Sequence, residues 1–215
     1  MPDRDRIGSP ANAAPSFPGD RARGEIEIVR EREVWSNELV RLFDDDVRYP
    51  DVDGKAKTGR QFRLAHAADN ADGVVVAPVL SDGRILLVRQ FRHPLRRFIA
   101  ELPRGSRERD EAPEDAAKRE LSEETGYEAA EIAPLGRVAP DSGQLATMPH
   151  LFAVVVGARR APHTEATEAI DRTLALTFRE LREACEAGDI VDAYTIAAVL
   201  RLARRFDGDR FLGLR

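Results

Sequence analysis

The chain has 215 residues, of which 33% are charged and 42% hydrophobic, and its net charge is −5. This length allows one domain, or one domain with a small appendage, and the composition is typical of a globular protein with an apolar core. Acidic and basic residues are interspersed, which argues against a nucleic-acid-binding protein because such a protein carries a basic stripe. The single cysteine, Cys185, excludes an internal disulfide framework and favours a reducing compartment, so we expect a cytoplasmic protein.

Residues 1–24 are predicted to form a disordered leader. They contain Pro2, Pro10, Pro15 and Pro18, and they show little apolar content and no periodicity. No apolar stretch of the kind found in a signal peptide occurs there, and no later apolar run is long enough to span a membrane. We therefore expect no association with a membrane.

Residues 25–66 are predicted to form a small antiparallel sheet. Apolar and charged residues alternate from residue 25 to residue 35, which is the pattern of a half-buried strand. Two further strands are expected at residues 39–43 and 60–65. A sheet of this size needs a surface to pack on. Trp35 is therefore expected in a core or at an interface.

Beyond this section the pattern favours buried strands. Residues 73–80 form a continuous apolar run, which is typical of a strand covered on both faces. An Asp-Gly turn at residues 81–83 indicates a hairpin, with residues 84–92 as the returning strand. The remaining expected elements are strands at 131–138, 151–157 and 173–177 and helices at 179–188 and 191–206.

Polar and basic side chains gather at the end of the second buried strand. Arg89, Gln90 and Arg92 end this strand, and Arg96 and Arg97 follow it. Guanidinium groups bind phosphate in a bidentate manner, so as a set these residues favour binding of a diphosphate substrate. For any single arginine of this set, an ordinary surface position is the alternative.

A helix is predicted from Pro113 to Gly126. Proline is suited to the first helical position, and Glu114 and Asp115 suit the first turn, where the helix dipole favours negative charge. Residues 116–121 are good helix formers. Gly126 is suited to the left-handed conformation that ends a helix.

This helix carries an unusual set of acidic residues. Glu120, Glu123 and Glu124 share one face, and Glu111 lies upstream. Like charges at this spacing repel, whereas a cluster of hard oxygen ligands is what Mg²⁺ or Mn²⁺ requires. Arg119 is placed to hold Glu123, which leaves Glu120 and Glu124 to face a metal. A solvated surface helix is the alternative, but it explains none of the spacing.

The spacing of these residues resembles the Nudix box. The matching pattern is Gly105, five residues, Glu111, seven residues, then Arg119-Glu120-Leu121-x-Glu123-Glu124-x-Gly126-Tyr127. Tyr127 stands where an aliphatic residue is commoner. The resemblance implies that Glu120 and Glu124 are metal ligands, that Glu111 completes the acidic site, and that the carbonyl of Arg104 contributes a ligand.

The residues before the box resemble the ADP-ribose pyrophosphatase branch of the Nudix hydrolases. Arg-Gln-Phe-Arg at 89–92 precedes Glu-Leu-Pro-Arg-Gly at 101–105, and the resemblance covers about residues 25–206. Two positions depart from the branch pattern. Arg104 replaces a small residue, and Ser142 stands where the branch has a proline, which here comes earlier as Pro140. Because of these departures, a different sugar nucleotide is an alternative substrate.

The resemblance also implies a fold and further functional residues. It implies an α/β fold of the Nudix α/β/α sandwich type with a mixed central sheet, over residues 67–208. The antiparallel section at residues 25–66 would pack on a second subunit to form a homodimer, and Trp35 could stack on adenine. A loop glutamate before the last strand would act as general base, with Glu168 as the first candidate and Glu165 as the second.

The predicted activity is hydrolysis of a nucleoside diphosphate-sugar with Mg²⁺ as cofactor and Mn²⁺ as the alternative. With ADP-ribose the products would be AMP and ribose 5-phosphate. A sugar nucleotide of the GDP-mannose or UDP-glucose type is an alternative substrate, and a nucleoside triphosphate is a less favoured one. An alternative of another class is a non-catalytic regulator that binds a nucleotide-sugar on the same fold. RNA decapping would need a basic surface, which the charge balance does not offer.

Overall fold

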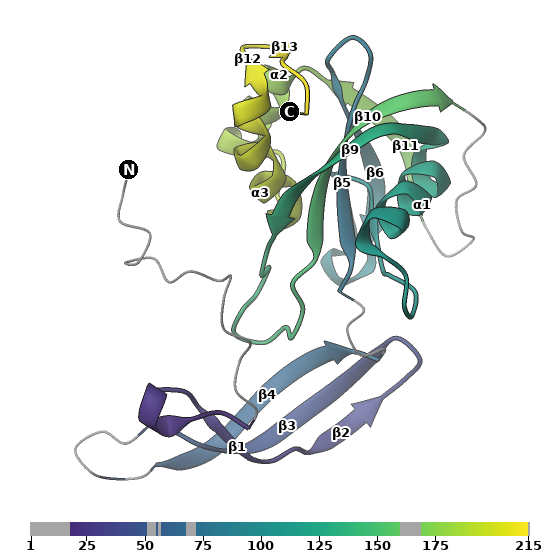
Figure 1. Ribbon diagram of the computed structural model, residues 1–215. Coiled ribbons are helices and arrows are strands. Elements are labelled where there is room, and N and C mark those ends of the chain that lie inside the picture. The colour runs from purple at the N-terminus through teal and green to yellow at the C-terminus, as the bar shows by residue number, and fades with distance from the viewer. Residues whose placement is uncertain (1–17, 51–54, 56, 68–71, 160–168, 215) are drawn as a thin grey trace. The chain divides into compact units, whose positions relative to one another are not determined.

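The computed structural model describes residues 18–50, 55, 57–67, 72–159 and 169–214 (Figure 1). The chain divides into two compact units, residues 1–67 and residues 68–215. Most of the expected leader lies outside the described residues. Its described end contains a short 3₁₀ helix, Arg21–Arg23, whose N-terminus is capped by the side chain of Asp20.

The N-terminal unit is an antiparallel sheet in which β3 pairs with all three other strands. The strands are β1 (Glu27–Arg30), β2 (Glu33–Ser36), β3 (Val40–Arg48) and β4 (Thr58–His66). The single strand expected at residues 25–35 is divided into β1 and β2. The carboxylate of Asp45 accepts the N–H of Arg32 at 3.0 Å, so a side chain replaces one ladder hydrogen bond at the break.

The two faces of this sheet differ in character. On one face, Phe43 and Asp45 of β3 are buried, and the Arg63 guanidinium lies 3.7 Å from the centroid of the Phe43 ring. On the other face, Trp35 pairs with Leu42 across the ladder, and Leu42 pairs with Leu64. Cross-strand partners share a face of a sheet, so these three apolar side chains lie in one row.

The second unit is built on a mixed seven-stranded sheet. Its main path runs β11-β6-β5-β10-β9, with β7 paired to β6 and β8 to β5. β10 and β5 are parallel, and the other pairs are antiparallel. The strands are β5 (Val74–Val79), β6 (Ile85–Arg92), β7 (Arg97–Glu101), β8 (Arg104–Gly105), β9 (Tyr127–Arg137), β10 (His150–Arg159) and β11 (Ile170–Leu176).

Helices cover both faces of this sheet (Figure 1). Val74 and Val76 of β5 belong to the apolar cluster with α1 (Pro113–Thr125), whereas Val75 and Ala77 belong to the cluster with α2 (Phe178–Ala187) and α3 (Ala193–Leu202). Successive side chains of a strand point to opposite faces, so an uninterrupted apolar run such as β5 supplies both cores. The predicted α/β/α sandwich with a mixed sheet is confirmed.

Two parts of the second unit differ from the sequence prediction. β7 and β8 form at residues for which no strand was expected. β7 pairs along β6, and the Phe98 ring packs edge-on against Phe91 with the ring centroids 5.3 Å apart. The helix expected at 191–206 ends at Leu202. The chain continues as a 3₁₀ helix, Ala203–Arg205, and a small hairpin of β12 (Phe206–Asp207) and β13 (Arg210–Phe211). Among the described helices, none combines the length and apolar character needed to cross a lipid bilayer.

Candidate active site

The helix α1 forms at the predicted residues for the predicted reasons. Pro113 occupies the first turn together with Glu114 and Asp115. At the other end Gly126 adopts φ +76°, and its N–H donates to the carbonyl of Ser122 at 2.9 Å. A residue with a β-carbon rarely adopts this left-handed conformation, so glycine ends the helix at this position.

Two of the box glutamates on α1 are buried. Glu120 and Glu124 are 5% and 2% exposed, whereas the side chain of Glu123 is 30% exposed. The backbone of Gly105 lies so close to the Glu120 carboxylate that a β-carbon at this position would overlap it. Glycine is therefore required at residue 105 for the carboxylate to reach the loop.

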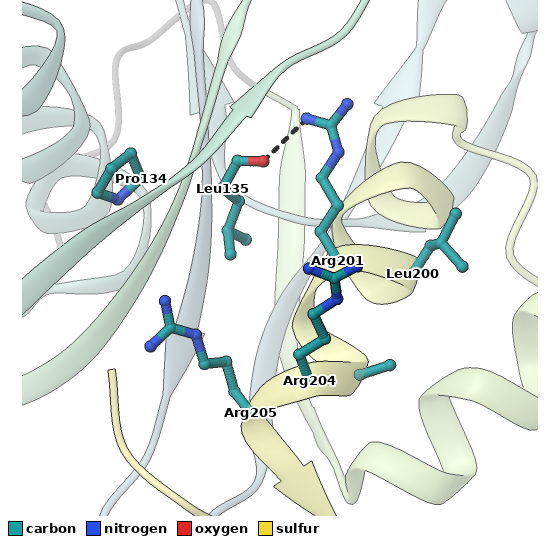
Figure 2. Close-up of a pocket in the computed structure, with 7 residues that line it drawn as sticks. Pro134, Leu135, Leu200, Arg201, Arg204 and Arg205 are labelled. Carbon is teal, nitrogen blue, oxygen red and sulfur yellow. Dashed lines mark hydrogen bonds between the residues drawn. The ribbon is translucent and has the colours of Figure 1, made fainter. Parts of the chain in front are cut away.

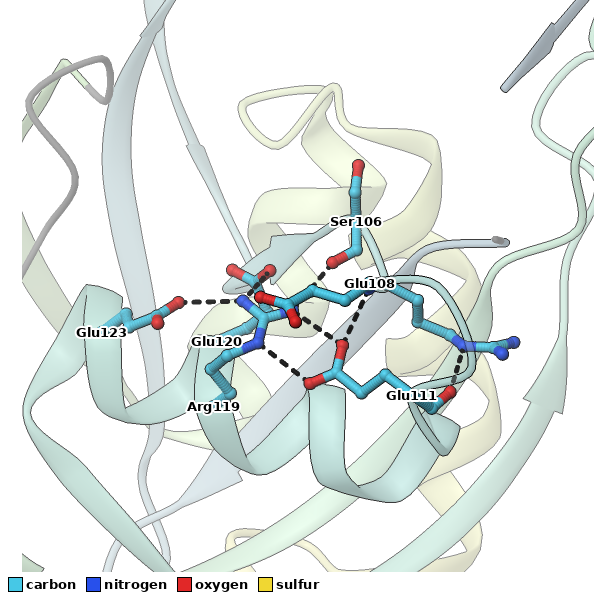
Figure 3. Close-up of polar contacts among 7 residues, drawn as sticks. Ser106, Glu108, Glu111, Arg119, Glu120 and Glu123 are labelled. Atoms are coloured by element: carbon cyan, nitrogen blue, oxygen red, sulfur yellow. Dashed lines mark hydrogen bonds and ion pairs between the residues drawn. The ribbon is translucent and has the colours of Figure 1, made fainter. Parts of the chain in front are cut away.

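Arg119 connects three carboxylates and the loop (Figure 3). Its Nε and Nη2 donate to the two oxygens of Glu111, both at 3.0 Å. Its Nη1 donates to Glu120 at 2.9 Å and to Glu123 at 3.0 Å, and Nη2 also donates to the carbonyl of Ser106 at 2.9 Å. The expected contact with Glu123 is present, but Arg119 also holds Glu111 and Glu120, which the sequence did not predict.

These contacts fix the charges of Glu111 and Arg119. The hydrogen bonds from Arg119 lower the pKa of Glu111 from its ordinary value, and the backbone N–H of Glu108 adds to this effect. The same bonds, with the charge of Glu120, raise the pKa of Arg119 further above its already high value. Glu111 is therefore ionised and Arg119 protonated at neutral pH, and the pair forms a charge-assisted fork.

The carboxylates offer oxygen donors of the type that Mg²⁺ and Mn²⁺ prefer. In the described part of the chain, however, no three acidic, histidine or cysteine side chains converge closely enough to hold a metal ion. The contacts of Arg119 account for this arrangement, because Glu111, Glu120 and Glu123 are spread around one guanidinium.

The two arginines expected to bind substrate, Arg89 and Arg92, have carboxylate partners. Arg89 forms an ion pair with Asp171 and lies over the Phe98 ring, 4.4 Å from its centroid. Arg92 forms an ion pair with Glu101. Gln90, between the two arginines, is 7% exposed. Trp35 lies in the N-terminal unit and is 52% exposed.

Arg104 departs from the branch pattern, and its side chain extends toward the start of α3. Its guanidinium lies 3.1 Å from Glu101 and 3.4 Å from Asp192, and it stacks on the Tyr194 ring at 4.6 Å. The backbone of Arg104, in β8, pairs with that of Val75 in β5. The large side chain is therefore accommodated by two carboxylates and an aromatic ring.

Sequence reasoning assigned no role to the two carboxylates of this network. Glu101 is fully buried, and its burial raises its pKa despite the two neighbouring guanidinium groups. Asp192 caps α3 by accepting the N–H of Thr195 at 2.9 Å. A cavity of about 210 Å³ beside them is lined by Arg92 and Arg104. A signal for Asp192 was present, since Asp is a preferred N-cap residue, but none marked Glu101 as a shared partner.

Glu165 and Glu168, the two candidates for the general base, lie outside the described residues. His150, at the start of β10, stacks on Phe152 with a centroid distance of 6.3 Å. Its burial and the charge of Arg137 lower its pKa.

Comparison with known proteins places this architecture in a family. The NUDIX domain model matches residues 69–198. The chain is 32% identical over 180 residues to an ADP-ribose pyrophosphatase of Bacillus subtilis, covering 81% of this chain and 91% of that protein. It is 29% identical over 177 residues to a methanol dehydrogenase activator of Bacillus methanolicus, with the same coverage of both chains.

Structural comparison agrees with the family match. The fold is similar to that of a crystal structure described as an ADP compounds hydrolase, with a TM-score of 0.69 at 16% identity over 83% of this chain and 92% of the other. At this level of identity the similarity supports the fold alone. The box pattern around Arg119, the sandwich fold and the matched domain all indicate the same family. The chain belongs to the Nudix hydrolases and is similar to the ADP-ribose pyrophosphatases among them.

Proposed function

We propose that the protein hydrolyses the diphosphate bond of a nucleoside diphosphate-sugar, with ADP-ribose as the preferred substrate. The observation that carries this proposal is the burial of Glu120, whose carboxylate lies beside Gly105, and of Glu124, one turn further along α1. Burying carboxylates one helical turn apart is costly, so the arrangement favours a function that uses their charge. The similarity to a B. subtilis ADP-ribose pyrophosphatase supports the choice of substrate.

Glu120, Glu124 and Glu111, with the carbonyl of Arg104, would hold one or more Mg²⁺ ions, with Mn²⁺ as a possible substitute. A bound cation would neutralise charge on the diphosphate and make the attacking water more acidic. Glu120 is already bonded to Arg119 at 2.9 Å. Arg119 would keep Glu120, Glu123 and Glu111 in place around the cation.

Arg89, Gln90 and Arg92 would orient the substrate at the end of β6. The ion pairs of Arg89 with Asp171 and of Arg92 with Glu101 limit the motion of both guanidinium groups. A guanidinium held in this way loses less conformational entropy when it binds a phosphate oxygen. Trp35 is the candidate for stacking on the adenine base.

A loop glutamate would take the proton of the attacking water, which then bonds to one phosphorus as the bond to the bridging oxygen breaks. Glu168 is the first candidate and Glu165 the second. The variants Glu168→Gln and Glu165→Gln separate them. The variant of the true base is expected to lose about 10² to 10⁴ in kcat while retaining substrate affinity.

The activity is tested by product release with Mg²⁺ from ADP-ribose, GDP-mannose, UDP-glucose and a nucleoside triphosphate. Glu124→Gln is compared with Glu183→Gln, which alters an exposed position on α2. We expect AMP from ADP-ribose with the wild type and Glu183→Gln, and a large loss with Glu124→Gln. A preference for another sugar nucleotide would retain the reaction class and reject ADP-ribose as the substrate.

The competing hypothesis is a non-catalytic regulator that binds a nucleotide-sugar. The similarity to a protein named methanol dehydrogenase activator supports this hypothesis. It predicts binding of ADP-ribose without product release from any compound of the panel. The same purified protein therefore distinguishes the two hypotheses.

We also propose that residues 25–66 mediate homodimerisation, that residues 67–208 carry the hydrolase, and that the protein is cytoplasmic. The row of Trp35, Leu42 and Leu64 on one face of the N-terminal sheet supports the dimer, since Trp35 is 52% exposed. Sedimentation equilibrium should detect a dimer that Trp35→Glu weakens. Leu212→Glu, at an exposed position in the second unit, is the control.

A further inference from the structure

A second basic site lies away from the Nudix box. A cleft of about 770 Å³ separates β9 from the end of α3 and the following 3₁₀ helix (Figure 2). α3 covers the face of the sheet opposite to α1, so the sheet lies between this cleft and the box glutamates. Its lining includes Pro134 and Leu135 from β9, and Leu200, Arg201, Arg204 and Arg205 from the helical side.

Arg201 is fixed in the cleft by the backbone of β9. Its Nη1 donates to the carbonyl of Leu135 at 3.0 Å, and its Nη2 donates to the carbonyl of Arg137 at 2.8 Å. Leu151 pairs with Gly136 and Phe152 with Pro134, so Leu135 is an extra residue in a β-bulge. The bulge leaves a carbonyl for the arginine, and a positive charge is held at a fixed place in the cleft.

Arg205 carries a polar atom that its own surroundings do not satisfy. Its Nη1 is buried and has no hydrogen-bond acceptor in the described part of the protein. Most buried polar groups in folded proteins have a hydrogen-bond partner, so Arg205 is an exception to that pattern. Within the described ranges, no carboxylate forms an ion pair with Arg201, Arg204 or Arg205.

The cleft carries more positive charge than is needed to offset the dipole at the C-terminus of α3. The C-terminus of a helix carries about half a negative charge, which one arginine offsets. Among the described residues, three arginines and no acidic residue line the cleft, although the whole chain has a net charge of −5. The positive charge is therefore local. Pro134, Leu135 and the exposed Leu200 add apolar surface beside it.

We propose that this cleft binds a small phosphate-bearing anion, with the phosphate on Arg204 and Arg205 next to Arg201. Guanidinium groups bind phosphate oxygens through paired hydrogen bonds, and Arg201, Arg204 and Arg205 all line the cleft. The cleft has the size of sites that hold mononucleotide-sized ligands. Its apolar wall suits the sugar or base of a phosphomonoester. The site is independent of the proposed hydrolysis.

The proposal is tested by calorimetric titration of the full chain with AMP and with inorganic phosphate. EDTA is present, so that metal-dependent hydrolysis does not contribute. The variants are Arg205→Ala and Arg204→Ala, since Arg204 is exposed and its removal should leave the fold intact. Arg182→Ala is the matched control, because it removes the same charge from an exposed position on α2. Circular dichroism verifies folding of each variant.

We expect Arg205→Ala to weaken AMP binding by at least about tenfold and Arg204→Ala to weaken it severalfold, with Arg182→Ala unchanged. In ¹⁵N spectra, AMP should shift the backbone amides of Gly136 and Arg204. Tighter binding of AMP than of phosphate would identify an organic phosphomonoester as the ligand. Equal binding of both would identify inorganic phosphate.

Three outcomes would overturn the proposal. The first is binding that neither cleft variant weakens, with amide shifts confined to residues around Glu120, because the anion would then occupy the Nudix site. The second is the absence of binding of either compound. The third is binding of an oligoglutamate peptide without binding of AMP or phosphate, which would assign the cleft to an acidic protein partner.

Discussion

At the scale of single residues, one guanidinium organises the box. Arg119 uses all three of its nitrogens, and its partners are Glu111, Glu120, Glu123 and the carbonyl of Ser106. A planar fork with five N–H groups can serve several acceptors in fixed directions. A lysine has a single ammonium on a flexible stem and cannot replace this geometry.

Arg119→Lys should therefore lower kcat by about 10²-fold, because the three carboxylates lose their common support and small misplacements in a site are costly. Steady-state kinetics with ADP-ribose and Mg²⁺ measure this effect. Lys118→Arg is the control, since Lys118 contacts only Asp115 among the residues described, at 3.0 Å. A kcat within a few fold of the wild type would show that Arg119 does not position the glutamates.

His150 should make stability depend on pH. Its pKa is lowered in the folded protein, mainly by burial and next by the charge of Arg137, although Asp72 acts in the opposite direction. The unfolded chain therefore takes up this proton first as the pH falls below 6.5. The contribution of His150 to stability is complete above that pH and declines until the folded pKa is reached.

The measurement is the free energy of unfolding by urea at about pH 7.5 and about pH 5.5. We expect the wild type to lose more stability over this interval than His150→Gln does, because the variant lacks the titrating group. An equal loss in the two proteins would contradict the assignment of the lowered pKa to His150.

At the scale of secondary structure, local signals decided the helices and some strands. Proline, acidic residues and glycine defined α1 at both ends, and the apolar run from residue 73 defined β5. β7 carries no such signal, because Arg97 and Phe98 are exposed and its pairing with β6 depends on contacts between strands. The division of β1 from β2 depends on the side chain of Asp45, which lies on another strand.

The start of α2 offers a test of a local signal. Thr177 accepts the N–H of Glu180 at 3.2 Å, and the Glu180 carboxylate accepts the N–H of Thr177 at 2.8 Å, which together form a capping box. Thr177→Ala should lower the free energy of unfolding by about 1 kcal/mol and the midpoint temperature by about 2 to 4 °C.

Thermal unfolding monitored by circular dichroism measures the effect of this substitution. Thr177→Ser is the matched control, because serine retains the hydroxyl that accepts the bond, and it should unfold within about 0.5 kcal/mol of the wild type. Equal destabilisation by alanine and serine would show that the methyl group of Thr177, rather than its hydroxyl, stabilises the helix.

At the scale of the whole molecule, the two units differ in the size of their cores. In the described part of the N-terminal unit, the fully buried apolar side chains are Phe43 and Val47. The second unit has an apolar cluster on each face of its sheet. Because stability grows with buried apolar area, we expect the N-terminal unit to unfold first.

The chain contains a reporter for each unit. Its single tryptophan, Trp35, lies in the N-terminal unit, and α1, α2 and α3 all lie in the second unit. In a guanidinium titration, the change in tryptophan fluorescence should precede the loss of helical circular dichroism. Coincident transitions would contradict this expectation and show that the two units unfold as one.

The sequence by itself determined the box and the elements around it, because helix caps, strand periodicity and the spacing of Glu111, Arg119 and Glu124 act over short distances along the chain. The family and the sandwich fold followed from the resemblance that this spacing carries. The tertiary structure alone revealed that Arg119 holds three carboxylates and that Glu101 joins Arg92 to Arg104. It also revealed the arginine cleft beside Leu135. These features depend on contacts between side chains from different elements, and the spacing of residues along one segment does not indicate such contacts.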